Sequence, residues 1–314
     1  MNLTSQPLVS IVTPVYNGER YLAECIESVL AQTYQNWKYS IVNNCSTDRT
    51  GEIAKAYAKQ DTRISIHTND YFLPVIQNHN RAFRLVSQES RYCKVVHADD
   101  WLHPECLTKM VEVAEKYPSV GIVGSYRLDG VKVNSDGFPY TSTVIPGREA
   151  CRSVMLGGKY IFGSPTTLLL RSDRIRSHQS FYNERNFHAD KEACFDVLRN
   201  SDFGFVYQVL SFTRRHNKTG TTFARKLNTF FLGELIILKK YGPLYLDEQE
   251  YKKVLREWTK RYYRFFIKNI FLRRGKRKEF WDYYKTGLQE LGFPISSAKL
   301  LKALVICHFT KSYR

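Results

Sequence analysis

The feature that most constrains the fold is a regular alternation of strand-like and helix-like segments between residues 8 and 125. The strand-like segments are β-branched and end at polar turns, whereas the helix-like segments carry apolar residues on one side. Such an alternation predicts an α/β fold, with helices on both faces of a mixed, mostly parallel sheet. The predicted strands are 8–18 with its turn, 37–42, 63–68, 92–98 and 120–125, and the predicted helices are 19–33, 46–59 with its cap, 74–86 and 103–118.

The pattern changes twice further along the chain. It loosens over 126–165, where turn-forming residues dominate. The ordered segments after this stretch are 164–175, a helix at 187–200 and a strand at 203–216. The rest of the chain indicates helices dense in Tyr, Phe, Lys and Arg, with a turn near Gly242-Pro243. We therefore predict one domain over 1–220 and a helical C-terminal extension over 221–314.

The positive charge is concentrated in that extension. The whole chain has a net charge of +17, of which 221–314 carries +13 and 1–220 only +4. A chain basic in one part only, with no recognised nucleic-acid-binding motif, argues against a nucleic-acid partner. The segment 261–281 alternates aromatic and basic residues, which suits an anionic membrane surface but also a helical subdomain with its aromatic side chains packed inside.

Cysteine usage and the N-terminus bear on the compartment. The seven cysteines are scattered without a C-x-x-C pair, which is typical of reduced core thiols in the cytoplasm. The first residues lack a basic region followed by an apolar run and a cleavage site, so secretion is not expected. We expect a cytoplasmic protein, placed peripherally on the inner face of the membrane if the extension binds lipid. The sequence leaves the oligomeric state open.

Two adjacent carboxylates, Asp99 and Asp100, follow the strand predicted at 92–98. Like charges side by side raise each other's pKa unless a cation lies nearby. A divalent ion such as Mg²⁺ or Mn²⁺ resolves this conflict, and it commonly binds one or two carboxylates together with substrate phosphates. The alternative is that the pair only begins the next helix, with Asp100 as its cap. Polar loops also follow the first two strands, at the sheet edge where α/β proteins bind ligands.

The ordered motifs "VSIVTPVYNG", "IVNNCSTDRT" and "HADDWLHPECLTKM" resemble the nucleotide-binding half of family 2 glycosyltransferases, which have the GT-A fold. The resemblance covers about 8–125 and resumes more weakly over 160–220. It implies a nucleotide-binding half over 1–125 and an acceptor-side half over 126–220. It also implies inverting transfer of a sugar from a nucleoside diphosphate sugar, with UDP or dTDP favoured. The acceptor would be a hydroxyl of a glycan or lipid-linked molecule, in polysaccharide or lipopolysaccharide assembly.

The same resemblance assigns roles to the polar loops. Nucleotide contacts fall on Thr13, Pro14, Tyr16, Asn43, Asn44 and Asp99. Asn44 stands where the family usually has the aspartate that accepts the uracil N3–H, and an amide oxygen can accept the same hydrogen bond. Asn43 and Asn44 as ordinary turn residues remain the alternative. The metal ligand falls on Asp100, with Mg²⁺ or Mn²⁺ as the cofactor.

The catalytic and acceptor-side roles rest on weaker motifs. "HADKE" resembles the family's general-base motif, which gives Asp190 as the base and Glu192 as its alternative, although Ala189 replaces the usual glutamate. The alternative is that each acid has no catalytic role and only stabilises the first turn of a helix, where negative charge is favourable. The diphosphate side falls on Arg214, Arg215 and His216, which a solvated basic face would also explain. The acceptor side falls on Trp101, Ser164, Pro165, Thr166 and His188.

Two further readings stay open. A nucleotidyltransferase would also place metal-binding carboxylates on an α/β sheet, but it would want a glycine-rich phosphate loop with a lysine, and none follows the first strand. A family member that binds the nucleotide sugar without catalysis is compatible with the Asn43-Asn44 departure.

Overall fold

The computed structural model describes residues 6–215, 227–271 and 278–293. The chain divides into two compact units. The first contains the residues up to Arg185 together with Ala189–Arg215. The second contains Asn186–His188 and the described residues beyond Arg215.

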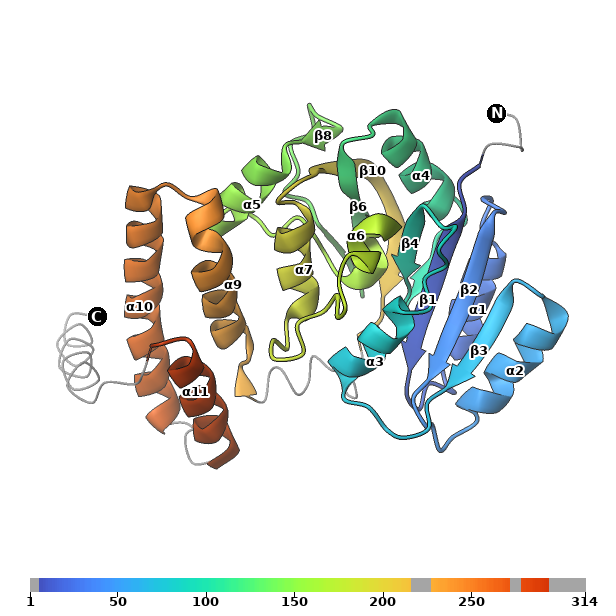
Figure 1. Ribbon diagram of the computed structural model, residues 1–314, viewed down its shortest axis with the longest axis horizontal. Helices are drawn as coiled ribbons and strands as arrows, with labels where there is room; N and C mark the ends of the chain where they lie inside the picture. The colour runs from blue at the N-terminus through green and yellow to red at the C-terminus, as the bar shows by residue number, and fades with distance from the viewer. Residues whose placement is uncertain (1–5, 216–226, 272–277, 294–314) are drawn as a thin grey trace. The chain divides into compact units, whose positions relative to one another are not determined.

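The first unit is built on one mixed sheet whose strands follow the order β3-β2-β1-β4-β9-β6-β10-β5 (Figure 1). The pairs β3-β2, β2-β1, β1-β4 and β6-β10 are parallel, whereas β9 runs antiparallel to both of its neighbours. The strands on this path are β1 (Val9–Val15), β2 (Trp37–Asn43), β3 (Ile64–Thr68), β4 (Tyr92–Val95), β5 (Trp101–Leu102), β6 (Val120–Asp129), β9 (Leu169–Arg171) and β10 (Asp202–Thr213). The prediction of a mixed, mostly parallel sheet is confirmed.

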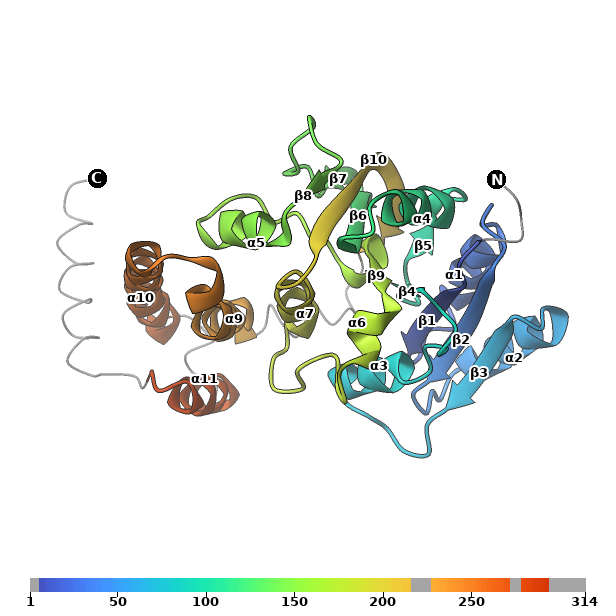
Figure 2. The same cartoon turned by 45° about the horizontal axis from the view of Figure 1, so that its top comes forward.

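Helices cover both faces of this sheet. Figure 2 shows α1 and α4 on one side and α3 and α6 on the other. The helices of the first unit are α1 (Leu22–Leu30), α2 (Thr50–Gln60), α3 (Val75–Phe83), α4 (Cys106–Lys116), α5 (Gly147–Met155), α6 (Ser172–Arg176) and α7 (Ala189–Val197). Each is short and packs its apolar side inward, as Leu22, Cys25, Ile26 and Val29 of α1 do.

The strand order reverses between β1 and β4, because β1 has β2 on one side and β4 on the other. This reversal is the switch point at which open α/β sheets bind ligands. Thr13 of β1 links this strand to the residues after β4, since its hydroxyl donates to the Val96 carbonyl at 2.7 Å. The same hydroxyl contacts the Tyr39 hydroxyl of β2 at 2.8 Å. The loop at 96–100 is thereby fixed beside the end of β1.

The structure differs from the sequence prediction in three places of this unit. β4 ends at Val95 because the chain then turns, with the Asp100 amide donating to the His97 carbonyl at 3.0 Å. The segment predicted as strand 120–125 extends to Asp129, since β10 pairs with it along its length. The loosely patterned stretch contains three short elements, which are β7 (Lys132–Asn134), β8 (Val144–Ile145) and α5.

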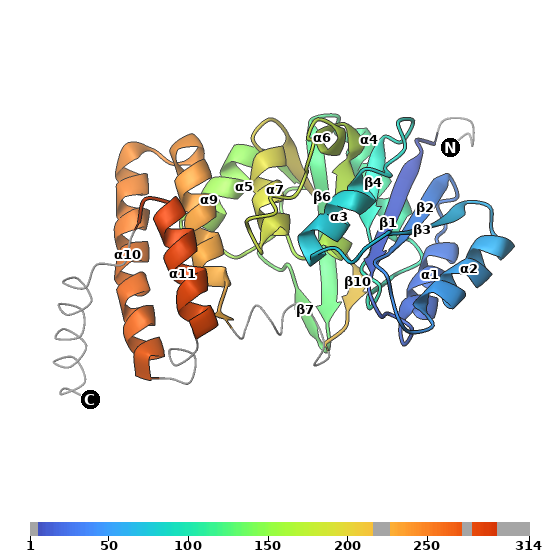
Figure 3. The same ribbon diagram turned by 60° about the horizontal axis from the view of Figure 1, so that its bottom comes forward.

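The second unit is helical. Its described helices are α9 (Phe230–Tyr245), α10 (Glu248–Phe271) and α11 (Lys278–Glu290), and Figure 3 shows them side by side. Aromatic side chains fill its interior, with Tyr262, Phe266, Phe280 and Tyr284 all fully buried. None of the helices that the structure describes is both long enough and apolar enough to cross a bilayer.

The turn predicted near Gly242-Pro243 lies a few residues later, at Leu246-Asp247 between α9 and α10, because both predicted residues lie inside α9. Pro243 occupies the last turn of that helix, which ends two residues later. Gly242 is required by packing rather than by a turn, since a Cβ there would lie 2.6 Å from the ring of Tyr251.

Candidate active site

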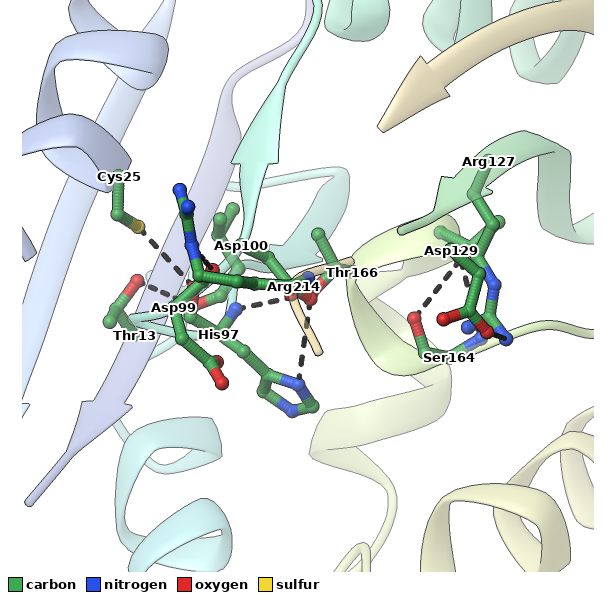
Figure 4. A network of polar contacts seen from close by, with 12 residues as sticks. Thr13, Cys25, His97, Asp99, Asp100, Arg127, Asp129, Ser164, Thr166 and Arg214 are labelled. Carbon is green, nitrogen blue, oxygen red and sulfur yellow. Dashed lines mark hydrogen bonds and ion pairs between the residues drawn. The ribbon is translucent and has the colours of Figure 1, made fainter. Parts of the chain in front are cut away.

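Asp100 is the most constrained carboxylate at the switch point. The residue is only 3% exposed, and each carboxylate oxygen accepts a hydrogen bond from a distant part of the chain (Figure 4). The Thr166 hydroxyl donates to Oδ2 at 2.6 Å, and the Arg214 backbone amide donates to Oδ1 at 3.1 Å. Burial raises the pKa of Asp100, with Asp99 adding to the effect and His97 opposing it. A cation bound at this carboxylate would favour its charged form and so oppose the rise in pKa.

An imidazole pair extends from this carboxylate. The Nδ1 of His97 lies 3.8 Å from Asp100 Oδ2, and its Nε2 lies 3.3 Å from Nε2 of His79. Burial and the neighbouring His97 lower the pKa of His79 to about 4, so His79 is neutral near pH 7. Its Nδ1 lies 2.8 Å from the Val75 carbonyl, which can only accept. Nδ1 therefore carries the proton, and Nε2 accepts from His97.

The end of β10 closes the site from the other side. The Arg214 guanidinium donates to the Asp99 carbonyl at 3.2 Å and to Glu24 of α1 at 2.5 Å, and lies over the Tyr21 ring. These contacts hold the Asp99-Asp100 loop against α1. Arg215 forms two hydrogen bonds to Asp129 of β6. His216 lies outside the described residues.

Asp190 and Glu192 lie in different environments at the start of α7. Asp190 is half-buried and lines a recess together with Tyr160, Ser164, Pro165 and Tyr182. Burial raises the pKa of the Tyr182 hydroxyl, and the nearby charge of Asp190 raises it further. Glu192 is 2% exposed and accepts hydrogen bonds from the Asn183 amide at 3.0 and 3.3 Å. Of the two acids, Asp190 is the one that faces a recess.

The acceptor-side residues predicted from the sequence fall into four places. Ser164 and Pro165 line the recess with Asp190, and Thr166 turns instead to Asp100. Trp101 stacks on Phe212, with ring centroids 5.4 Å apart. Side chains alternate along a strand, so Phe212 lies on the opposite face of β10 from Ser211 and Thr213. His188 belongs to the second unit, where it contacts the Thr229 hydroxyl at 2.9 Å.

The nucleotide-side residues also divide. Tyr16 is half exposed and contacts Phe72 edge-to-face at 4.9 Å, which leaves aromatic surface open beside β1. Thr13 and Pro14 are buried within the strand. Asp99 is half-buried beside Asp100.

The two asparagines after β2 are occupied by the protein itself. The Asn44 oxygen accepts from the Asn69 side chain and the Leu73 amide, both at 2.9 Å, and its nitrogen donates to the Leu73 carbonyl at 2.8 Å. Asn43 accepts from the Ser46 amide at 3.1 Å, as a turn residue does. A nucleobase contact by Asn44 would have to replace one of the bonds that hold the 69–73 loop.

The residues fit a metal that completes its coordination with substrate oxygens. No group of three or more His, Cys, Asp or Glu side chains in the described ranges is arranged to hold an ion alone. A carboxylate has about four lone-pair sites, and hydrogen bonds use two of those on Asp100. Mg²⁺ and Mn²⁺ are commonly held in this manner by one or two carboxylates and a diphosphate.

Several residues of this site carried no signal in the sequence. His79 lies on a segment predicted only as a helix, Asn183 lies between the segments predicted at 164–175 and 187–200, and Tyr160 lies in the loosely patterned stretch. Arg127 and Asp129 lie beyond the predicted end of their strand. His97 was visible in "HADDW", but only the structure shows its ring facing Asp100.

A family model described as glycosyl transferase family 2 matches residues 10–177, more than half of the chain. The chain is 34% identical over 145 residues to the glycosyltransferase GlyG of Streptococcus pneumoniae, a stretch that covers 46% of each protein. It is 37% identical over 111 residues to EpsJ of Bacillus subtilis, described as an uncharacterized glycosyltransferase, covering 35% of this chain and 31% of EpsJ. The chain spans less than half the length of the curated relatives it matches.

Solved structures share the fold at low identity. A crystal structure of TarS from S. aureus superimposes with a TM-score of 0.64 at 17% identity, over 91% of this chain and 80% of that one. The same protein is known in complex with UDP-GlcNAc. The mannosyltransferase PcManGT of Pyrobaculum calidifontis, in complex with GDP-Man and Mn²⁺, matches with a TM-score of 0.59 at 14% identity, over 98% and 81%. These likenesses confirm the predicted GT-A fold.

Proposed function

This chain belongs to glycosyl transferase family 2, and from that premise we propose that it transfers a sugar from a nucleoside diphosphate sugar to an acceptor hydroxyl. One observation carries the proposal: the first unit has two separate acidic centres with different surroundings. Asp100 is buried and hydrogen-bonded at the carboxyl edge of the sheet, which suits a cation-held diphosphate. Asp190 faces a recess lined by tyrosines, which suits a sugar hydroxyl.

The metal side of the reaction rests on Asp100, with Asp99 beside it. A bound Mg²⁺ or Mn²⁺ supplies Lewis-acid neutralisation of the diphosphate that leaves. The protein's own part is to hold the Asp100 carboxylate in one orientation, which the Thr166 hydroxyl and the Arg214 amide do from two directions. His97 lies beside the same carboxylate, with its Nδ1 3.8 Å from Oδ2, and His79 contacts the far nitrogen of the His97 ring.

The acceptor side rests on Asp190. Its carboxylate takes the proton of the acceptor hydroxyl while that oxygen bonds to the anomeric carbon. The bond from the anomeric carbon to the diphosphate oxygen breaks on the opposite face, so the anomeric configuration inverts. Glu192, bound to Asn183, supports the start of α7 in this proposal.

The donor is proposed to be a UDP- or dTDP-sugar. Tyr16 and Phe72 offer an aromatic surface on which a base can stack, and TarS, which shares the fold, binds UDP-GlcNAc. PcManGT binds GDP-Man on the same fold, so the fold itself does not select the base. The acceptor is proposed to be a glycan or lipid-linked hydroxyl, in cytoplasmic polysaccharide assembly.

Membrane docking of the second unit is proposed through charge rather than through aromatic insertion. Exposed cations recur every three or four residues along α10, at Lys253, Arg256, Lys260, Arg264 and Lys268. Such spacing forms one basic stripe that suits an anionic lipid surface. The aromatic residues between them pack inside the unit, as one of the two alternatives from the sequence expected. Flotation with vesicles containing anionic lipid, against neutral vesicles, tests this proposal.

The donor proposal is tested by thermal shift with UDP-, dTDP- and GDP-sugars, each with and without Mn²⁺. We expect a nucleotide sugar to raise the melting temperature only when the metal is present, and Asp100→Asn to abolish that rise. Release of the nucleoside diphosphate in the presence of a glycan acceptor panel then tests transfer. Metal-dependent binding without any release across the panel would favour a non-catalytic binding protein.

A further inference from the structure

A polar patch outside the acidic centres lies on one face of β6 and β10. In the parallel pairing of these strands, Ser211 is level with Arg127 and Thr213 is level with Asp129. Residues level with each other in a sheet, and residues two apart along a strand, point to the same face. The side chains of Arg127, Asp129, Ser211 and Thr213 therefore share one face, and Arg215 follows them two residues beyond Thr213.

The charges of this patch do not balance. Asp129 accepts two hydrogen bonds from Arg215, one from Arg127 at 3.4 Å and one from Asn134 at 3.0 Å. Two guanidinium groups thus share the single carboxylate of the patch, and the further acidic charges that act on them belong to Asp99 and Asp100 outside it. The Arg127 side chain is only 14% exposed, and burial lowers its pKa although the charge of Asp129 opposes this.

Hydrogen-bonding groups of the patch are also left over. The Nε of Arg127 and the hydroxyls of Ser211 and Thr213 are buried, and none has a hydrogen-bond partner among the described residues. Leaving such buried groups unpaired destabilises the folded state, so native proteins normally give them a ligand or an ordered water. Three of them at adjacent register positions, beside two guanidinium groups that share one carboxylate, have the composition of an oxyanion site.

The patch lies towards the acceptor side of the site. The η2 turn (Pro165–Thr167), which follows the recess residue Ser164, packs on both β6 and β10. Tyr160, another residue of that recess, and Asp100 both lie within electrostatic reach of Arg127. Arg215, with 42% of its side chain exposed, marks the open side of the patch.

We propose that Arg127, Ser211 and Thr213 form an oxyanion subsite, and that the acceptor therefore bears a carboxylate or a phosphate near its reacting hydroxyl. This inference rests on the proposed transferase function, which supplies the acceptor, and it deepens that function by naming the chemical class of the acceptor. The Arg127 guanidinium and the two hydroxyls donate to the oxyanion, while Asp129 holds Arg215 at the rim. No covalent step takes place at this subsite.

Direct binding to the full chain tests the subsite without requiring transfer. The probes are methyl β-glucuronide and glycerol 3-phosphate, compared with neutral methyl β-glucoside and glycerol, by calorimetry in buffer containing EDTA. We expect each anionic probe that fits to bind about tenfold to hundredfold more tightly than its neutral partner, as expected for charge-assisted hydrogen bonds. Equal affinity of the charged and neutral probes overturns the proposal.

Variants assign the binding to these residues. Arg127→Gln should abolish the preference for the anion, whereas Arg148→Gln, at an exposed arginine of α5, should leave it unchanged. The double variant Ser211→Ala/Thr213→Val removes only unpartnered hydroxyls, so it should keep or raise the melting temperature while it lowers anion affinity about tenfold. If Arg127→Gln fails to fold, the double variant decides alone, and unchanged anion affinity in it refutes the subsite.

The source of the anion is decided by a second comparison. If Arg127→Gln weakens binding of UDP-glucuronate but not of UDP-glucose, and the free probes do not bind, the oxyanion belongs to the donor and the acceptor assignment is wrong. If the anionic probes bind through Arg127 but no nucleotide sugar binds with Mn²⁺, the subsite stands and the proposed transferase function fails. The two failures are therefore distinguishable.

Discussion

Replacing Thr166 by valine isolates the hydrogen bond that orients the proposed metal ligand. The Thr166 hydroxyl donates to Asp100 Oδ2 at 2.6 Å and accepts from the His97 amide at 3.2 Å, and Asp100 is buried. Valine keeps the shape of the side chain but removes both bonds. Hydrogen bonds to charged groups contribute about 1.5–3 kcal/mol, and loss of such an outer partner typically weakens metal binding 10–100-fold. We therefore expect Thr166→Val to raise the Kd of Mn²⁺ in the presence of UDP by that factor.

The matched control is the neighbouring residue. Thr167 is equally buried, but its hydroxyl bonds to Ser164 rather than to Asp100. Thr167→Val should lower the melting temperature without changing the Mn²⁺ affinity. Thr166→Ser keeps the hydroxyl, so it should retain most of the Mn²⁺ affinity that Thr166→Val loses. Calorimetric or electron paramagnetic resonance titration of Mn²⁺ measures the affinity. A folded Thr166→Val protein that binds Mn²⁺ and UDP within twofold of the wild type, or an equal loss in Thr167→Val, would refute the reasoning.

Three further predictions concern other residues. Asp190→Asn should cut turnover about 10²–10⁴-fold with UDP binding retained, whereas Glu192→Gln should act mainly on stability; initial rates and UDP affinity of both variants decide between the two acids. Lys94 is fully buried beside Met110, and burial lowers its pKa, so it stays neutral in the fold over a pH range in which the unfolded chain is protonated. Between the lowered pKa of the folded protein and about pH 10.5, the free energy of unfolding of the wild type relative to Lys94→Met should rise with pH, by at most about 1.4 kcal/mol per pH unit. Urea unfolding at a series of pH values up to about 10 measures this slope, and parallel curves for the two proteins contradict the prediction. Asn44→Asp introduces the residue usual in the family, but a carboxylate cannot donate to the Leu73 carbonyl. The variant should therefore lower the free energy of unfolding by about 1–3 kcal/mol, as measured by urea unfolding.

The parts of the site that could be predicted from the sequence are those formed by residues close together in one segment. The strand and helix periods are local, and so is the pair of carboxylates directly after β4. The partners of Asp100 are not local, because Thr166 is 66 residues away along the chain and Arg214 is 114. Similarly, only the register between β10 and β6 shows that Ser211 and Thr213 lie beside Arg127 and Asp129. The aromatic residues of α10 illustrate the limit, since the same alternation with cations suits a membrane surface and a packed interior.

These long separations have a consequence for how the site forms. The motifs resembling the family's nucleotide-binding half all lie before residue 125, yet Asp100 is oriented by a hydroxyl from η2 and an amide at the end of β10. Without those partners a buried carboxylate would lose both of its described hydrogen bonds, and its charged form would be strongly disfavoured. The proposed metal site therefore requires the segments beyond β6 to have folded onto the first four strands. A ligand that binds Asp100 must stabilise this whole arrangement, because binding to the folded state alone shifts the unfolding equilibrium of every element that completes the site.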